Sequence, residues 1–102
     1  MSQKPKNKIQ IKYKNAINYP VDQDRDYTVS DLLQNHLKLK VLMSGTKVWV
    51  YDYIYNAKRK RYTFGKLANE RKGDGYTPAQ ARDAVSNWEA IRKRGKNPLA
   101  EV

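Results

Sequence analysis

The stretch from Lys47 to Tyr55 (KVWVYDYIY) constrains the fold of this chain more than any other. Aromatic rings occupy every second position from Trp49 onward, and smaller or acidic side chains stand between them. Period-two alternation of aromatic and β-branched residues predicts a β-strand and does not fit an α-helix. One face of this strand should therefore carry Trp49, Tyr51, Tyr53 and Tyr55, and the other face Val48, Val50, Asp52 and Ile54.

A second alternating segment runs from Arg59 to Phe64. Asn56 and Ala57 are predicted to form a two-residue turn before it, although the glycine that usually follows asparagine in such turns is absent. The two strands should form a ribbon whose aromatic side packs on a core and whose cationic side meets a polyanion. In the second strand the aromatic side holds Tyr62 and Phe64, and the cationic side holds Arg59, Arg61 and Thr63.

A third alternating segment, His36 to Met43, precedes this ribbon, and residues 44–46 (SGT) form the turn between them. The alternation predicts another strand with an apolar face and a basic face. We therefore expect three antiparallel strands joined in sequence order by short turns. The apolar face of the added strand holds Leu37, Leu39 and Val41, and its basic face holds Lys38 and Lys40.

Residues 77–95 carry the clearest helix signal. Thr77 fits the N-cap, Pro78 the first helical position and Gln80 the third, which together predict a capping box. Gly95 is expected to end the helix. Apolar residues at helical spacing form one stripe that can cover the sheet: Ala81, Ala84, Val85, Trp88 and Ile91.

These elements predict an α+β fold, in which a three-stranded antiparallel β-sheet packs on one C-terminal α-helix and carries a flexible basic N-terminal arm. We expect the arm in residues 1–26, the β-β-β-α domain in residues 27–95 and the start of a linker in residues 96–102, as in a fragment of a longer protein. Residues 28–35 are expected to hold a helical turn, because Thr28 or Ser30 fits a cap position. Residues 65–75, with three glycines, should be a loop.

The charge of the chain indicates its partners rather than its fold. The formal net charge is +11 and the pI about 9.9, and nucleic acid is the commonest partner of a small protein this basic. The sequence has no long apolar run and no basic amphipathic helix with an apolar face, so no membrane association is indicated. No signal peptide is visible either, and we therefore expect a cytoplasmic protein. The absence of cysteine excludes disulfides.

Catalysis is not expected. His36 is the only histidine and there is no cysteine, so neither a metal site nor a histidine-activated nucleophile can be assembled. No glycine-rich phosphate loop is present, and the tyrosines are interpreted as core or rim residues. We therefore expect no cofactor, no metal and no small-molecule substrate.

An ordered set of short motifs carries a family resemblance. It comprises a turn with GTK (residues 45–47), Trp49 and Tyr53 in W-x-x-x-Y, and a basic strand closing on glycine, KRYTFG (residues 60–65). A helix opening with AQAR (residues 79–82) and ending in RGKNP (residues 94–98) completes it. Over residues 36–99 the chain resembles the amino-terminal arm-type DNA-binding domain of phage and genomic-island tyrosine recombinases (integrases).

The resemblance implies a three-stranded sheet laid in the major groove of arm-type DNA sites. It further implies a non-catalytic module of a parent tyrosine recombinase that acts in DNA integration and recombination in a bacterial host cell. Other integrase protomers would be partners through the parent chain. The chain departs from the family where the central strand carries Val50, Asp52 and Ile54 in place of basic residues, so we expect the two flanking strands to make most DNA contacts.

Between His36 and Lys66 there are eight lysines or arginines and one aspartate, whereas a merely soluble face would mix both signs. We expect most of these cations to contact phosphates, and Arg59, Arg61 or Lys40 to reach base edges. Val50 and Ile54 either touch thymine methyl groups or are ordinary strand formers. The predicted double-stranded-DNA-binding residues are Lys38, Lys40, Lys47, Lys58, Arg59, Lys60, Arg61, Thr63 and Lys66.

Two alternatives remain open at this point. An RNA-binding module would need exposed aromatic rings on which single-stranded bases can stack. A protein–protein assembly domain of a nucleoprotein complex would be favoured by an exposed patch around Val50 and Ile54 and by a free edge strand.

Overall fold

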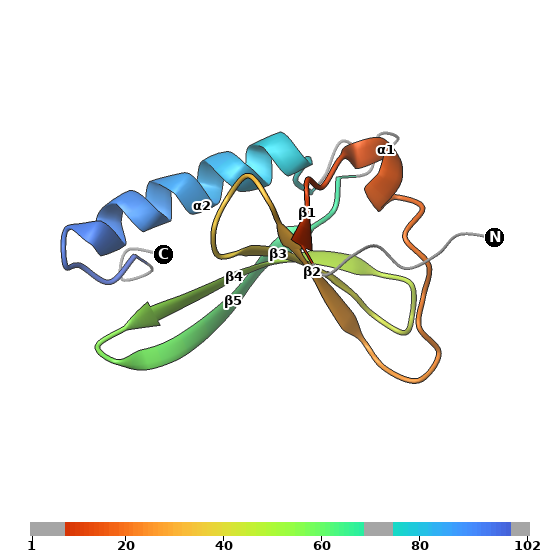
Figure 1. The fold of residues 1–102 in the computed structure, drawn as a ribbon, viewed down its shortest axis with the longest axis horizontal. Coiled ribbons are helices and arrows are strands. Elements are labelled where there is room, and N and C mark those ends of the chain that lie inside the picture. Colours follow the sequence, from red (N-terminus) through yellow and green to blue (C-terminus); the bar gives the residue numbers. More distant parts are fainter. Residues whose placement is uncertain (1–7, 69–74, 99–102) are drawn as a thin grey trace.

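In the part of the chain that the structure describes, five strands form one mixed sheet, and a long helix crosses one of its faces (Figure 1). The structure is a computed structural model and describes residues 8–68 and 75–98. The strands lie in the order β1-β2-β3-β4-β5. The elements are β1 (Lys8–Ile9), α1 (Tyr13–Ala16), β2 (Tyr27–Asp31), β3 (Leu37–Val41), β4 (Lys47–Tyr55), β5 (Lys58–Lys66) and α2 (Pro78–Lys93).

The three predicted strands are present as β3, β4 and β5, each antiparallel to the next. The predicted three-stranded sheet is nevertheless wrong in extent, because β2 pairs antiparallel with β3 and β1 pairs parallel with β2. The α+β class and the C-terminal helix are confirmed. Part of the predicted loop over residues 65–75 belongs to β5, and residues 69–74 lie outside the described residues.

The helical turn expected in residues 28–35 is wrong, since residues 27–31 form β2. Val29 is buried opposite Leu39, and Thr28 and Ser30 point to the other side of the sheet. Threonine, serine and aspartate favour helix caps, but a Tyr-x-Val alternation also fits a half-buried strand. The segment forms a strand rather than a helical turn because it pairs with β3.

The flexible arm expected over residues 1–26 is not what the structure shows for its described part, residues 8–26. This part contributes β1, the short helix α1 and three core side chains, Ile11, Ala16 and Tyr19. The expectation of a flexible arm was based on the many lysines of the segment and gave too little weight to these apolar positions. The rest of the expected arm, residues 1–7, lies outside the described residues.

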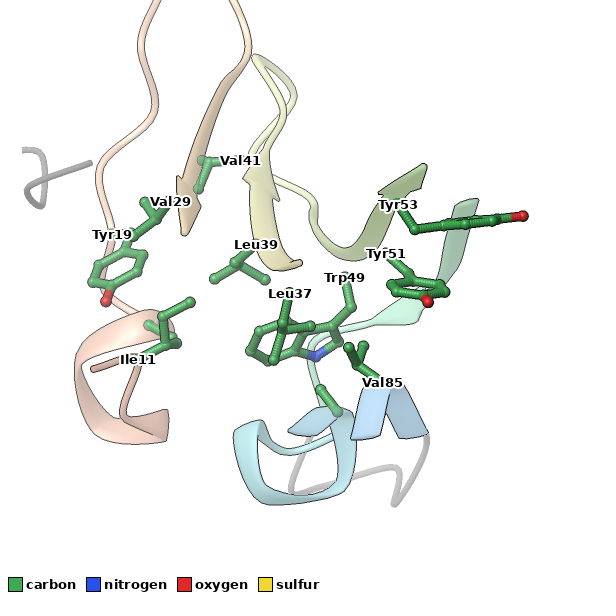
Figure 2. Close-up of a cluster of buried hydrophobic side chains, with 12 residues drawn as sticks. Ile11, Tyr19, Val29, Leu37, Leu39, Val41, Trp49, Tyr51, Tyr53 and Val85 are labelled. Carbon is green, nitrogen blue, oxygen red and sulfur yellow. The ribbon is translucent and has the colours of Figure 1, made fainter. Parts of the chain in front are cut away.

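The core lies between the sheet and α2. Trp49 is fully buried, and its indole Nε1 donates a hydrogen bond of 2.8 Å to the backbone oxygen of Tyr76. Figure 2 shows Val85 of α2 directed toward Trp49 and Tyr51 of the sheet. Burying a large apolar side chain contributes about 1.5–3 kcal/mol, so these rings supply much of the driving force for folding. The buried cluster consists of Ile11, Ala16, Tyr19, Val29, Leu37, Leu39, Val41, Trp49, Tyr51, Tyr53, Ala81 and Val85.

Helix α2 begins and ends as the sequence predicts. The Thr77 hydroxyl accepts from the backbone N–H of Gln80, and the Gln80 side chain accepts from the backbone N–H of Thr77, which completes the capping box. Gly95 follows the C-cap residue Arg94 with a φ of +83°, a conformation that glycine adopts without steric strain.

A buried ion pair joins α2 to β2 and to the N-terminal segment. The Arg82 guanidinium donates to both carboxylate oxygens of Asp31, at 2.8 and 2.9 Å, and to the backbone oxygen of Ile11 at 2.7 Å. Asp31 is 1% exposed and also accepts from the backbone N–H of Ile11 at 3.1 Å. Both oxygens of the Asp31 carboxylate therefore accept hydrogen bonds, as a buried charge requires.

Replacing Arg82 with alanine should destabilise the domain strongly. The Asp31 carboxylate would remain buried without its charged partner, and breaking such a pair costs about 3 kcal/mol or more. Urea denaturation followed by tryptophan fluorescence measures the change. Arg94→Ala is the control, because Arg94 is exposed and its loss should change the unfolding free energy by less than about 0.5 kcal/mol. Equal effects of the two substitutions would contradict the role given to the pair.

The predicted two-residue turn between β4 and β5 is confirmed, since Tyr55 pairs with Lys58 across Asn56 and Ala57. Both turn residues are left-handed, with φ of +53° for Asn56 and +61° for Ala57. Such a turn matches the twist of the strands, but a left-handed alanine is strained by about 1–2 kcal/mol.

Ala57→Gly should therefore raise the melting temperature. Relief of strain outweighs the greater freedom of glycine in the unfolded chain, leaving a net gain of about 0.5–1 kcal/mol. Thermal denaturation followed by circular dichroism tests this. Ala79→Gly, in the first turn of α2, is a matched control expected to lower stability by a similar amount. A lower melting temperature for Ala57→Gly would refute the strain argument.

Candidate nucleic-acid interface

The strand register divides the sheet into two faces. The inner face carries Trp49 and Leu39 and lies under α2, and the outer face is the opposite side. Residues paired across antiparallel strands point to the same side, which assigns every strand position to one of the two faces. Over strands β2–β5 the outer face consists of Thr28, Ser30, Lys38, Lys40, Val48, Val50, Asp52, Ile54, Arg59, Arg61, Thr63 and Lys66.

Six of the nine predicted DNA-binding residues lie on this outer face, namely Lys38, Lys40, Arg59, Arg61, Thr63 and Lys66. The other three pair with inner-face residues: Lys47 with Val41, Lys58 with Tyr55 and Lys60 with Tyr53. The Lys47 ammonium donates to the backbone oxygen of Ile17 at 3.5 Å, and its burial lowers the Lys47 pKa. The structure thus gathers six of the predicted residues and separates three from them.

A β-bulge brings Lys66 to the outer face. Trp49 pairs with Gly65 and Val50 with Thr63, so Phe64 is an extra residue in β5. The extra residue reverses the alternation beyond it and turns Lys66 outward opposite Val48. Gly65 is needed at the bulge, because a Cβ there would lie 2.6 Å from carbons of the Tyr76 ring.

Asp52 gathers three cations of the outer face around one carboxylate. Arg59 donates through Nε to Oδ1 at 3.1 Å and through Nη2 to Oδ2 at 2.6 Å, a two-pronged pairing. The Lys38 ammonium lies 2.9 Å from Oδ2, and Nη2 of Arg61 lies 3.4 Å from the same oxygen. Three strands therefore meet at this carboxylate: β3 through Lys38, β4 through Asp52 itself and β5 through the two arginines.

The electrostatics of this cluster keep Asp52 ionised. The Asp52 side chain is only 6% exposed. The hydrogen bond from Arg59 outweighs the effect of burial and, with Lys38, holds the pKa of the Asp52 carboxyl well below its usual range. The same hydrogen bond raises the pKa of Arg59. The three cations keep a net surplus of positive charge while their side chains are held in place.

The two apolar outer residues of β4 differ in accessibility. Val50 is 1% exposed between its register neighbours Lys38 and Thr63, whereas Ile54 is 56% exposed. Long cationic side chains can cover an apolar neighbour with their methylene stems. Ile54 is therefore accessible on the outer face, whereas Val50 is covered.

Tyr51, one of the tyrosines expected in the core, forms a hydrogen-bond network with α2. The Tyr51 hydroxyl donates to Glu89 Oε2 at 2.5 Å, and Arg92 donates to both Glu89 oxygens at 2.6 and 2.9 Å. Burial favours the neutral form of Glu89, but the hydrogen bonds from Arg92 and Tyr51 prevail and lower its pKa. Burial and the bond to Glu89 raise the pKa of Tyr51, which keeps the hydroxyl protonated. This network fixes the helix on the sheet.

His36 is half-buried and is part of this structural framework. Its Nδ1 lies 2.8 Å from the backbone oxygen of Asp52, and a carbonyl oxygen can only accept, so Nδ1 carries the proton. Its Nε2 lies 3.3 Å from Glu89 Oε1. Within residues 8–68 and 75–98 no group of three or more metal-ligating side chains is found.

Sequence reasoning missed two features of the outer face. The sequence marks Asp52 only as a departure from a basic central strand, whereas the structure places it at the centre of the cationic cluster. Thr28 and Ser30 of β2 extend the face by one strand beyond the predicted sheet. The alternation of tyrosine and valine at positions 27 and 29 was the signal for β2, but the cap preferences of its other residues masked it.

The fold and the outer face define a class of small nucleic-acid-binding domain, in which one sheet face is packed with rings and the other is cationic. Residues 7–102 match the family model of the arm DNA-binding domain. The chain therefore belongs to the arm DNA-binding domain family, a non-catalytic module associated with integrase-type recombination, which confirms the resemblance seen in the sequence. No curated protein matches the chain. None of the described helices is long and apolar enough to cross a membrane.

Removing the Asp52 charge should change how stability depends on pH. The pKa of Asp52 is lowered by folding, so its stabilising effect is present above the unfolded value of about 4 and is lost as the pH falls below it. Urea denaturation between about pH 5 and pH 2 should show a steeper loss for the wild type than for Asp52→Asn, by at most about 1.4 kcal/mol per pH unit. Parallel stability curves would contradict the pairing.

Proposed function

We propose that this domain binds arm-type sites in duplex DNA through its outer face, as the amino-terminal module of a phage or mobile-element integrase. The observation that carries the proposal is the gathering of five cations on the face that α2 leaves open. On strands β3–β5 these cations are Lys38, Lys40, Arg59, Arg61 and Lys66, and the one carboxylate that these three strands place on the same face is that of Asp52.

The shape of the outer face suits the major groove. A β-ribbon fits this groove, which is about 12 Å wide. The β4–β5 ribbon carries Arg59 and Arg61 on its outer side, and arginine pairs with both acceptors of guanine. The outer face can therefore approach base edges while its margins contact phosphates.

The cations divide into two groups by their partners. Lys38, Arg59 and Arg61 are held by Asp52, and a guanidinium that is already oriented loses less conformational entropy when it pairs with a base. Lys40 and Lys66 have no acidic partner within the described residues, so their ammonium groups are free to follow phosphates. We assign base readout to the arginines and backbone contact to these lysines.

The alternatives have less support. Stacking of single-stranded RNA needs exposed rings, but Trp49, Tyr51 and Tyr53 are buried on the inner face. An assembly surface around Val50 and Ile54 is not continuous, because Val50 is buried. A further part of the proposal is that the parent chain is a tyrosine recombinase of a bacterial host cell, acting in its cytoplasm with other integrase protomers.

The domain boundaries also remain a proposal. We place a linker from residue 96 onward and the DNA-binding unit in residues 27–95. Residues 8–26 are best counted with that unit, since Ile11, Ala16 and Tyr19 share its core. DNA contact by the inner-face residues Lys47, Lys58 and Lys60 would require the hairpin end or the sheet edge to approach DNA.

Neighbouring substitutions on β5 test the proposal. Arg61→Gln and Lys60→Gln each remove one positive charge, but Arg61 lies on the outer face and Lys60 on the inner face. Binding to a random-sequence duplex, measured by fluorescence anisotropy over a range of salt, should weaken several-fold for Arg61→Gln and much less for Lys60→Gln. On a random-sequence duplex the arginines contact phosphates as well, so the wild type should show a log–log salt slope near −4 to −5, as about five neutralised phosphates require.

Two results would refute the proposal. A salt-independent affinity of the wild type would exclude phosphate contact. Equal weakening by Arg61→Gln and Lys60→Gln would show that the outer face is not the binding surface. Arg61 suits the test because its contact with Asp52 is the longest of the cluster, so its loss should leave the other pairings intact.

A further inference from the structure

A hollow of about 540 Å³ lies where the loop before β2 meets the outer face. Its floor includes outer-face residues of β2 and β3. Arg61 reaches it from β5, the strand at the opposite edge of the same face. None of the motifs that identify the family falls on its β2 side. The hollow is lined by Arg25, Asp26, Tyr27, Thr28, Ser30, Lys40 and Arg61.

The lining has the chemistry of an anion site. Arg25, Lys40 and Arg61 outnumber the one carboxylate, so the lining carries a net charge of about +2. The Asp26 carboxylate already accepts the backbone N–H of Met43 at 2.8 Å, through Oδ1. The hydroxyls of Thr28 and Ser30 add neutral donors, and Thr28 lies directly opposite Lys40 in the register.

The width of the sheet decides which part of DNA can lie over this hollow. Neighbouring strands are about 4.8 Å apart, so β2 and β5 are separated by roughly 14 Å. The major groove is about 12 Å wide, and it cannot admit all four strands side by side. With the β4–β5 ribbon in the groove, β2 has to lie over the sugar–phosphate backbone that borders it.

We propose that this hollow holds a phosphodiester group of the DNA backbone, and this inference rests on the proposed binding of duplex DNA by the outer face. Arg25 and Lys40 supply the charge, and Thr28 and Ser30 donate hydrogen bonds to the phosphate oxygens. Side chains of these types make most phosphate contacts in protein–DNA complexes. The contact sets the register of the ribbon in the groove and places Arg59 and Arg61 against the bases.

Arg25→Gln and Thr28→Val test the site without touching the ribbon. Arg25→Gln should weaken binding to a random-sequence duplex about five- to tenfold at about 0.1 M salt and make the log–log salt slope shallower by about 0.9, as the loss of one phosphate contact requires. Thr28→Val keeps the β-branched shape and should weaken binding by a smaller factor, about two- to fivefold, with an unchanged slope. Arg94→Gln is the matched control, because Arg94 is exposed at the end of α2, on the other side of the sheet.

The outcomes separate this inference from the proposal on which it rests. If the wild type binds duplex and Arg61→Gln weakens binding, but Arg25→Gln behaves like Arg94→Gln, the hollow is not a contact site and the inference is overturned. If the wild type binds no duplex, the proposed function itself fails, and the inference with it.

A second experiment distinguishes binding of a DNA phosphate from binding of a free anion. Amide NMR signals of Thr28 and Ser30 should shift on titration with duplex and remain nearly unchanged with millimolar inorganic phosphate. Saturable shifts with inorganic phosphate and none with duplex would assign the hollow to a small anion and overturn the inference.

Discussion

The architecture depends on the packing of a single long helix against one side of a twisted sheet. Helix α2 covers the inner face, where Trp49 and Tyr51 are fully buried, and the described residues supply no second element of that length for the other side. An antiparallel sheet with one packed face must present polar side chains on the other. The positive outer face is therefore a consequence of which face the rings occupy, and a one-residue slip of β4 would exchange the two faces.

Asp52 shows how such a face can be cationic and ordered at once. Like charges on neighbouring strands repel one another and disorder long side chains, and a shared carboxylate relieves the repulsion. Its charge reduces the attraction for DNA, yet it orients the Arg59 guanidinium by two hydrogen bonds and draws in Lys38. Long-range attraction is set by net charge, whereas discrimination among bases is set by donor geometry. The centre of the outer face thus holds donors in a fixed orientation, whereas Lys40 and Lys66 keep charges that no carboxylate of the described residues neutralises.

The sequence was most informative where several local preferences agreed. In β4, β5 and α2 the alternation, the turn at Asn56 and the Thr77 capping box all pointed to the same structure, and the observed elements match them. In β2 the preferences conflicted, since Thr28 and Ser30 fit a cap as well as a strand, and only pairing with β3 resolved them. The partnership of Asp52 with residues up to 14 positions away could not be predicted without knowing the register. The bulge at Phe64 likewise places Gly65 against the Tyr76 ring, a contact between residues 11 positions apart that the strand pattern does not indicate.

Arg82 illustrates why a motif residue in a DNA-binding family need not contact DNA. It lies in the AQAR segment that marks the family resemblance, yet its guanidinium is directed at Asp31 and Ile11 on the inner side of the sheet. Asp31 ends β2, and the outward side chains of the same strand are Thr28 and Ser30. The ion pair thus couples α2 to the strand whose outward side chains line the hollow. A change in that pair would displace the strand that carries the proposed phosphate contact, although no residue of α2 lines the hollow.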